Sequence, residues 1–275
     1  MKPIALHRTI TNLATHYNLS YVVEQRITLA WKQFSDVCQK HNIQEVAPED
    51  IVQIYRHWRS SSHSAENMKK RMGYLRRVLK FACAMGYIHR NPADLFVLPH
   101  ISRKDPVSLP GDEIQSIRTA RLFLPHLVLT RDAFLFQCYT GLAYIDVRNF
   151  NRECIATVEG KRYVLGMRHK KDAKFIFPLL PEALEILERY NYKIPVYSNA
   201  RMNLYLKDIA EHAKVKTHLT THVGRRTFGQ IMLDKGVSIE TVSKMLGHKS
   251  TATTEKFYAR AGLQRIINEV GKMAA

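Results

Sequence analysis

The sequence predicts a mainly α-helical protein with one small antiparallel β-sheet, divided into two domains. Apolar residues recur at helical spacing through the first hundred residues and again from residue 181 onward. Between residues 154 and 178, short segments rich in β-branched and aromatic residues are separated by turn residues, which is typical of strands. Prolines among polar and charged residues interrupt the helical pattern at residues 99–110, which indicates a linker between domains.

The composition favours a globular protein that meets a polyanion. The 275 residues suffice for one large domain or two of ordinary size, and an apolar fraction of 45% allows a proper core. Lysine and arginine number 42 against 24 acidic residues, and the net charge of +18 is spread along the chain. Such a balance favours nucleic acid, with a membrane surface as the rival. Because no signal peptide or membrane-length apolar run occurs, we expect a cytoplasmic protein with no membrane partner.

The four cysteines predict neither a metal site nor a disulfide framework. Cys38, Cys83, Cys138 and Cys154 lie far apart, without CxxC spacing, inside apolar patterns. We therefore interpret them as small core residues.

The first domain, residues 1–98, is predicted to be a helical bundle. One helix is expected over residues 20–41, a second from Pro48, and a third from the N-cap Ser64 to Met85, before Gly86. The expected core face of the third helix consists of Met68, Met72, Leu75, Leu79 and Ala82.

The other side of that third helix is strongly basic. It carries Lys69, Lys70, Arg71, Arg76, Arg77 and Lys80, with almost no acidic residue between them. A solvated face is one interpretation, and a phosphate-binding face is the one we favour.

The second domain, residues 111–275, is predicted to mix helices with a sheet. Helices are expected at residues 112–118, at 133–139 before Thr140-Gly141, and from Pro181 onward. Strands are expected at residues 154–158, 162–168 and 174–178, with turns near 159–160 and 171–172.

The residues that carry chemistry gather in the last third of the chain. It contains His222-Val223-Gly224-Arg225, then Leu246-Gly247-His248, and Tyr258 ten residues later. A phenol oxygen can attack phosphorus, a guanidinium can bind two non-bridging oxygens, and imidazoles can donate hydrogen bonds or move a proton. These groups could together break a phosphodiester without a metal. A pair of ordinary core aromatics is the alternative for Phe257-Tyr258.

These motifs resemble those of the tyrosine recombinases, or phage integrase family, from about residue 20 to the end. The resemblance implies a SAM-like N-terminal core-binding domain and a C-terminal catalytic domain that close around DNA. It implies that Tyr258 is the nucleophile, that Arg225 binds the phosphate, and that His222 and His248 support it. Arg226 points elsewhere on the helix, and we expect it to bind the DNA backbone or a carboxylate.

A strand-end cluster, Arg168-His169-Lys170, resembles the place of the family's hairpin lysine. Lys170 would then protonate the departing 5′-oxygen, whereas Lys171 would point to the other face. A solvent-facing strand end with several cations is the alternative interpretation.

One position departs from the family's pattern. Its first arginine normally follows Thr-Gly-Leu, but here Ala143 follows Thr140-Gly141-Leu142, while the expected acid is present as Asp146. Another arginine could substitute, the enzyme could be slow, or the protein could bind DNA without cutting it. Arg148 would lie about 140° from Ala143 on a helix. We therefore hypothesise that Arg168, which shares the strand face of Lys170, supplies the missing charge.

The resemblance implies a site-specific recombinase that cuts and rejoins double-stranded DNA through a 3′-phosphotyrosyl intermediate, without ATP, metal or another cofactor. It also implies a homotetramer on two DNA sites, with a monomer or weak oligomer in the absence of DNA. Integration of a mobile element, excision, inversion and dimer resolution all stay open. An amphipathic segment at residues 262–273 could dock on its own domain or on a neighbour, and no arm-type DNA-binding domain is expected ahead of the first domain.

Other classes of function fit less well. Residues 237–247 could belong to the helix-turn-helix of a transcription factor, but Tyr258 and the His-x-x-Arg spacing would then have no purpose. A type IB topoisomerase uses similar chemistry, but the compact helical first domain fits recombinases better. A metal-dependent nuclease would need clustered carboxylates.

Overall fold

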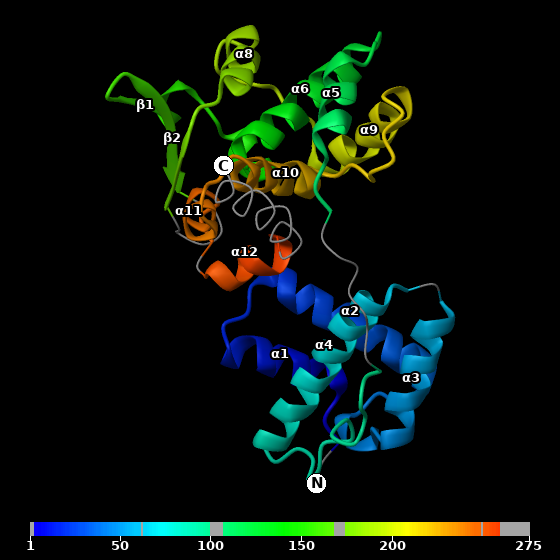
Figure 1. Cartoon of the computed structure of the whole chain (residues 1–275). Coiled ribbons are helices and arrows are strands. Elements are labelled where there is room, and N and C mark those ends of the chain that lie inside the picture. Colours follow the sequence, from blue (N-terminus) through cyan, green and yellow to red (C-terminus); the bar gives the residue numbers. More distant parts are fainter. Residues whose placement is uncertain (1–2, 62, 100–106, 168–173, 249, 259–275) are drawn as a thin grey trace, which may run out of the picture. The chain divides into compact units, whose positions relative to one another are not determined.

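A computed structural model describes residues 3–61, 63–99, 107–167, 174–248 and 250–258 (Figure 1). The chain divides into two compact units, Met1–Arg103 and Lys104–Ala275. The described residues are mainly helical and include a three-stranded antiparallel sheet, so the predicted fold class is confirmed. None of the helices described is both long and apolar enough to cross a bilayer.

The first unit is helical throughout its described regular elements. They are α1 (Leu6–His16), α2 (Tyr21–Cys38), the short 3₁₀ helix η1 (Ile43–Glu45), α3 (Pro48–Ser60) and α4 (Ala65–Ala84). The three predicted helices correspond to α2, α3 and α4, and the Ser64 side chain caps α4 by accepting a hydrogen bond from the Asn67 backbone N–H.

Helix α1 was not predicted from the sequence. Its N-cap, Ala5, makes no side-chain hydrogen bond, so the usual start signal is absent. What stabilises α1 is tertiary burial, because Leu6, Ile10 and Leu13 pack into the core of the first unit together with α2 and α4.

The second unit contains the sheet and the remaining helices. In chain order they are α5 (Gly111–Thr119), α6 (Pro125–Thr140), α7 (Tyr144–Arg148), η2 (Arg152–Cys154), β1 (Ile155–Val158), β2 (Lys161–Met167), β3 (Lys174–Pro178), α8 (Pro181–Arg189), α9 (Asn199–His212), α10 (Thr221–Asp234), α11 (Ile239–Met245) and α12 (Thr251–Tyr258).

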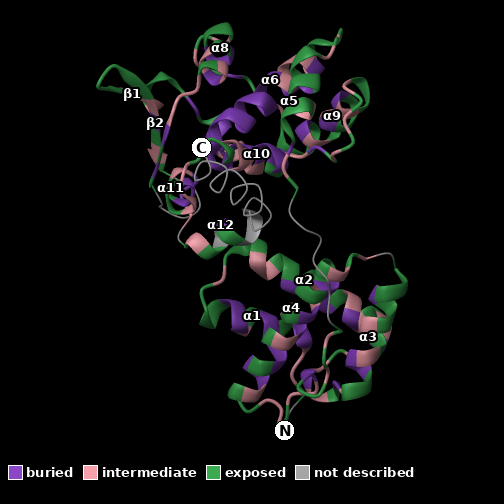
Figure 2. Cartoon of the chain, viewed as in Figure 1, coloured by how far each residue is buried: buried purple, intermediate pink, exposed green. Residues whose placement is uncertain are grey.

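Helix α6 is the central element of this unit. It contacts α5, α8, α9 and α10, and every residue from Asp132 to Thr140 is buried (Figure 2). It begins at Pro125, eight residues before the predicted start at residue 133. The prediction was wrong at this end because only Leu127 and Thr130 are buried in this first part of the helix, which is too few to form a recognisable apolar stripe.

The sheet has the order β1-β2-β3 with antiparallel neighbours. Val164 pairs with Phe177, and both are buried, whereas the neighbouring pair of Leu165 and Ile176 is exposed on the opposite face. The observed strands match the predicted ones to within one residue. Helix α11 packs against β3, which brings the sheet to the histidine and tyrosine motifs.

The cysteines are free thiols at packed positions. Cys38 and Cys138 are buried, and Cys83 and Cys154 are half-buried. Burial, aided by the charge of Asp50, raises the pKa of Cys38 to about 11, and burial also raises the pKa of Cys138. Neither buried thiol is therefore poised as a nucleophile.

Candidate active site

The first turn of α10 carries His222 and is fixed by side chains of α9. The Thr221 hydroxyl donates to Asn199 Oδ1 at 3.0 Å, and the Thr221 N–H donates to Asn203 Oδ1 at 3.1 Å. The N-cap, Thr220, accepts a hydrogen bond from the Val223 N–H. His222 is thus exposed on a rigid helix start, one turn before Arg225, as the His-x-x-Arg spacing predicts.

Arg225 joins three segments that are far apart in the sequence. Its Nη1 donates to the carbonyl oxygen of Gly141 at 2.6 Å, and its Nη2 donates to the carbonyl oxygen of Leu246 at 2.5 Å. Two of its five N–H donors therefore hold the guanidinium at the end of α6 and at the Leu-Gly-His motif. This arrangement fixes the plane of the guanidinium before any ligand binds.

The turn at Gly141 allows this approach. Gly141 has φ +65°, in the left-handed region that suits glycine, and it ends α6 with a hydrogen bond from its N–H to the Gln137 carbonyl. A methyl group on Gly141 would lie 2.5 Å from Phe228 Cδ1 and 2.9 Å from Leu246 Cδ2. The backbone at this turn therefore packs directly on α10 and on the Leu246 segment.

His248 is presented by a similar turn at the end of α11. Gly247 has φ +60°, and the His248 N–H donates to the Ser243 carbonyl at 3.0 Å. The ring Nδ1 lies 2.8 Å from the hydroxyl of the buried Thr254, in α12. Since this hydroxyl occupies Nδ1, a phosphate would meet the Nε2 side of the ring. The sequence gives Thr254 no recognisable role, because its contact with His248 exists only in the fold.

Helix α12 carries Tyr258 one turn after Thr254, and α12 packs against α11. The helix thus brings the tyrosine's backbone to the same group of elements as His248. Arg168, Lys170 and Lys171 lie outside the described residues. The strand ends that flank them, Met167 and Lys174, pair with each other in the sheet.

Ala143 follows directly after the turn that binds Arg225. It is half-buried at the N-cap of α7, and its N–H donates to Asp146 Oδ2 at 3.3 Å. Arg148, at the end of α7, is exposed. Among the described residues, no group of three or more histidine, cysteine and acidic side chains is placed to bind a metal ion.

The basic residues of α4 fall into two groups. Lys69, Lys70, Arg77 and Lys80 are exposed. Arg71 and Arg76 are half-buried: Arg71 donates to Gln33 and lies over the Trp58 ring, and Arg76 donates to the Phe96 carbonyl. Arg71 and Lys70 also line a pocket of about 270 Å³ with Arg26 of α2, so the positive surface extends from α4 onto α2.

The sequence profile of the phage integrase family matches residues 108–265, more than half of the chain. The chain belongs to the phage integrase family. The predicted class of enzyme, a tyrosine recombinase, is thereby confirmed. The match includes every motif residue described above, from Gly141 to Tyr258.

Individual relatives of this integrase-family chain support the same family assignment. It is 27% identical over 199 residues to a tyrosine recombinase of Thermosipho africanus, covering 68% of this chain and 69% of the relative. It is 21% identical over 280 residues to the tyrosine recombinase XerC of Anoxybacillus flavithermus, covering 88% of this chain and 92% of the relative. A lambda integrase tetramer bound to a Holliday junction superposes with a TM-score of 0.76 at 17% identity, over 93% of this chain and 78% of that one. The structural likeness shows the fold.

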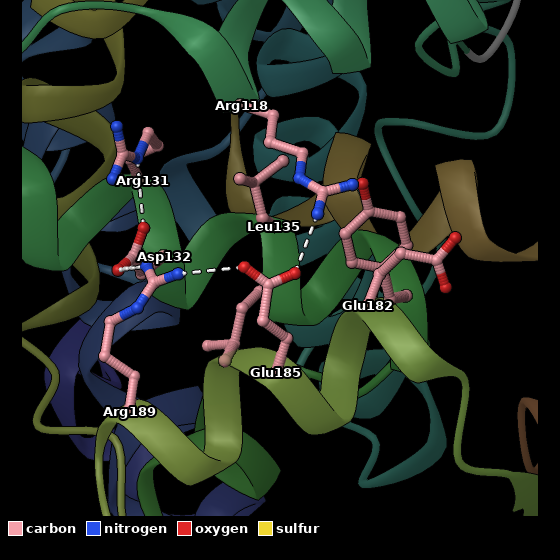
Figure 3. Close-up of a pocket in the computed structure, with 9 residues that line it drawn as sticks. Arg118, Arg131, Asp132, Leu135, Glu182, Glu185 and Arg189 are labelled. Atoms are coloured by element: carbon pink, nitrogen blue, oxygen red, sulfur yellow. Dashed lines mark hydrogen bonds and ion pairs between the residues drawn. The ribbon is translucent and has the colours of Figure 1, made fainter.

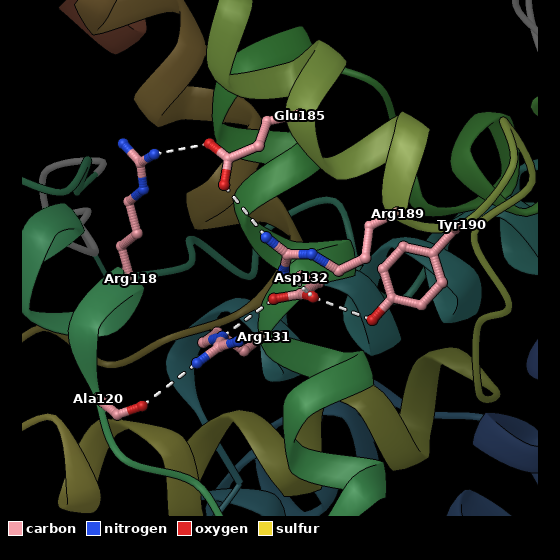
Figure 4. A network of polar contacts seen from close by, with 7 residues as sticks. All are labelled: Arg118, Ala120, Arg131, Asp132, Glu185, Arg189 and Tyr190. Carbon is pink, nitrogen blue, oxygen red and sulfur yellow. Dashed lines mark hydrogen bonds and ion pairs between the residues drawn. The ribbon is translucent and has the colours of Figure 1, made fainter.

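A charged cluster that the sequence did not reveal lies on α6 of this integrase-family protein. The Asp132 carboxylate is buried and accepts hydrogen bonds from Arg131 Nε, Arg189 Nη1 and the Tyr190 hydroxyl at 3.0, 2.7 and 2.9 Å (Figure 4). The cluster borders a pocket of about 120 Å³ between α5, α6 and α8 (Figure 3). It joins α8 to the helix that ends at Gly141.

Proposed function

We propose that this tyrosine recombinase cuts and rejoins DNA at specific sites through a 3′-phosphotyrosyl intermediate on Tyr258. The observation that carries the proposal is the position of Arg225, whose guanidinium is hydrogen-bonded to both the Gly141 turn and the Leu246 carbonyl. A fixed guanidinium opposes the negative charge that develops on phosphate oxygens without reorganising during the reaction.

In the proposed reaction, the Tyr258 oxygen attacks the scissile phosphorus and the bond to the 5′-oxygen breaks. A phenol of pKa about 10 is mostly protonated at neutral pH, so its proton must pass to a base such as His222 or His248. Lys170 protonates the departing 5′-oxygen. The phosphotyrosine bond retains the free energy of the broken phosphodiester, so a 5′-hydroxyl can reverse the step without ATP.

The proposed DNA grip uses both units. Residues 1–98 act as the core-binding domain, residues 99–110 as the linker and residues 111–275 as the catalytic domain, which the two compact units support. The exposed Lys69, Lys70, Arg77 and Lys80, and Arg226 on α10, bind backbone phosphates. Arg71 and Arg76 hold the helix that presents this face. Solved relatives bound to DNA, including the tetramer on a Holliday junction, support double-stranded DNA as partner and a tetramer as the working form.

The first test is a covalent-trapping assay without metal, using nicked suicide duplexes drawn from DNA that flanks the gene. We expect wild-type protein to give a slow-migrating, protease-sensitive protein–DNA adduct, and Tyr258→Phe to give none. Binding of both proteins without any adduct would instead favour the second candidate function, a DNA-binding protein that has lost cleavage. Ala143, at the position of the family's first arginine, is the observation that favours this alternative.

Within the proposed mechanism, Arg168 supplies the guanidinium that is missing at position 143, where the chain has alanine. Losing a phosphate clamp weakens transition-state stabilisation by about 3 kcal/mol, by analogy with an oxyanion-hole donor. We therefore expect Arg168→Ala to lower the rate of adduct formation by roughly a hundredfold at saturating DNA. Arg148→Ala is the matched control, since it removes an exposed arginine that does not share a face with position 143. If Arg168→Ala cleaves DNA at the wild-type rate, Arg168 does not replace the missing arginine.

A further inference from the structure

Gln137 is a buried amide with an incomplete set of hydrogen bonds. Its side chain, on α6, has no exposed surface. Its Nε2 donates to the Leu142 carbonyl at 3.2 Å, but its Oε1 accepts no hydrogen bond in the part of the chain that the structure describes. Since an unsatisfied buried acceptor is unfavourable, an apolar side chain of similar size would avoid this penalty. Core packing alone therefore does not account for glutamine here.

The bond that Gln137 does make lies next to the carbonyl that binds Arg225. Gln137 holds the oxygen of Leu142, while Arg225 binds the oxygen of Gly141, one peptide unit earlier. The peptide between Leu142 and Ala143 is held at its other end too, because the Ala143 N–H donates to Asp146. Rotation of this turn would swing the Gly141 carbonyl away from the guanidinium.

Gln137 also lies where α6 crosses α10. A methyl group on Gly224, the residue before Arg225, would lie 3.2 Å from Gln137 Cβ and 3.0 Å from Phe134 Cε2. The Gln137 backbone carbonyl accepts the hydrogen bond from Gly141 that closes α6. One residue thus contacts the helix that carries Arg225 and binds the turn that orients it.

We propose that Gln137 is a positioning residue for the recombinase reaction: its amide fixes the turn at residues 141–143, and the turn fixes Arg225. This inference rests on the proposed function for its catalytic consequence. In this role Gln137 does not touch DNA and acts only through the Gly141 carbonyl.

The test compares Gln137→Leu with wild type by two measurements on the full chain. The first is the rotation rate of the Arg225 guanidinium about its Cζ–Nη bonds, measured by ¹⁵N NMR and assigned with Arg225→Lys. We expect it to rise about tenfold or more in Gln137→Leu, because the Gly141 carbonyl is no longer held in place. The second is the single-turnover rate of adduct formation at saturating DNA, expected to fall about tenfold at an unchanged half-saturating DNA concentration.

A merely structural role predicts other results. The leucine removes one hydrogen bond and one unsatisfied acceptor together, so we expect a thermal midpoint within about 4 °C of wild type. Thr130→Val is the matched control on α6, because it deletes a buried hydroxyl bonded to the His126 carbonyl far from the turn. It should lower the thermal midpoint and leave both the rotation rate and the cleavage rate unchanged.

Two outcomes overturn the proposal: a wild-type rotation rate of Arg225, or a wild-type cleavage rate, in Gln137→Leu. If Gln137→Leu does not fold, Gln137→Met provides the same comparison with an unbranched side chain. Failure of the proposed function is distinguishable, since the wild type would then form no adduct. The proposed effect of Gln137 on cleavage would then be wrong as well. The NMR measurement would still decide whether Gln137 positions Arg225.

Discussion

Arg225→Ala is expected to lower the rate of phosphotyrosyl adduct formation roughly a thousandfold, the upper range for losing an electrostatic donor at a developing oxyanion. The substitution removes the guanidinium that would bind the scissile phosphate, and the side chain that joins the Gly141 and Leu246 carbonyls. The measurement is a single-turnover trapping assay at saturating DNA.

The two roles of Arg225 can be separated with Arg225→Lys. Lysine keeps the positive charge but cannot form the planar fork that binds two acceptors at once. We expect Arg225→Lys to bind DNA with nearly the wild-type salt dependence, because net charge is unchanged, yet to cleave about a hundredfold more slowly. Arg148→Ala, at an exposed arginine, should cleave at nearly the wild-type rate. Equal losses in Arg148→Ala and Arg225→Ala would mean that only overall charge matters.

The sequence predicted the local parts of this site because they depend on spacing along one helix or turn. His222 and Arg225 lie one helical turn apart, and glycine before His248 adopts the positive φ that its position requires. The glycine at position 141 likewise ends α6 where the pattern indicated. Each of these features is encoded within a few residues.

The contacts that hold the site together were not predictable in this way. Arg225 binds carbonyls 84 and 21 residues away, and a backbone oxygen has no signature in the sequence. Thr254 and Gln137 look like ordinary helix residues until the fold places them beside His248 and the Gly141 turn. Helix α1 was missed for a related reason, since tertiary burial stabilises it more than local signals do.

Asp132→Ala is expected to lower the free energy of unfolding by about 2 kcal/mol, because it removes a buried acceptor and leaves the half-buried Arg131 and Tyr190 groups without it. The Asp132 side chain is only 2% exposed and accepts from Arg131, Arg189 and Tyr190. Chemical denaturation of the full chain measures this loss. Because the chain has two compact units, the transition of the second unit is the one to follow.

Glu185→Ala is the matched control, since Glu185 binds the same Arg189 but its side chain is 51% exposed. Water screens this pair, and we expect a loss below about 1 kcal/mol. Equal losses in the two variants would show that burial of Asp132 does not govern the cluster.

Tyr190 provides a local readout for the same cluster. Burial and the negative charge of Asp132 raise the pKa of Tyr190 to about 12, so the folded protein favours the protonated phenol. This contribution to stability is present below the ordinary pKa of about 10 and is lost as the pH rises through the folded-state value. In Asp132→Ala the pKa of Tyr190 should fall toward the ordinary value. A pH titration of phenolate absorbance measures it, with Asp132→Ala/Tyr190→Phe as the reference that lacks the Tyr190 signal. An unchanged titration would mean that burial alone sets this pKa, and that Asp132 holds α8 to α6 through Arg189 rather than through the tyrosine.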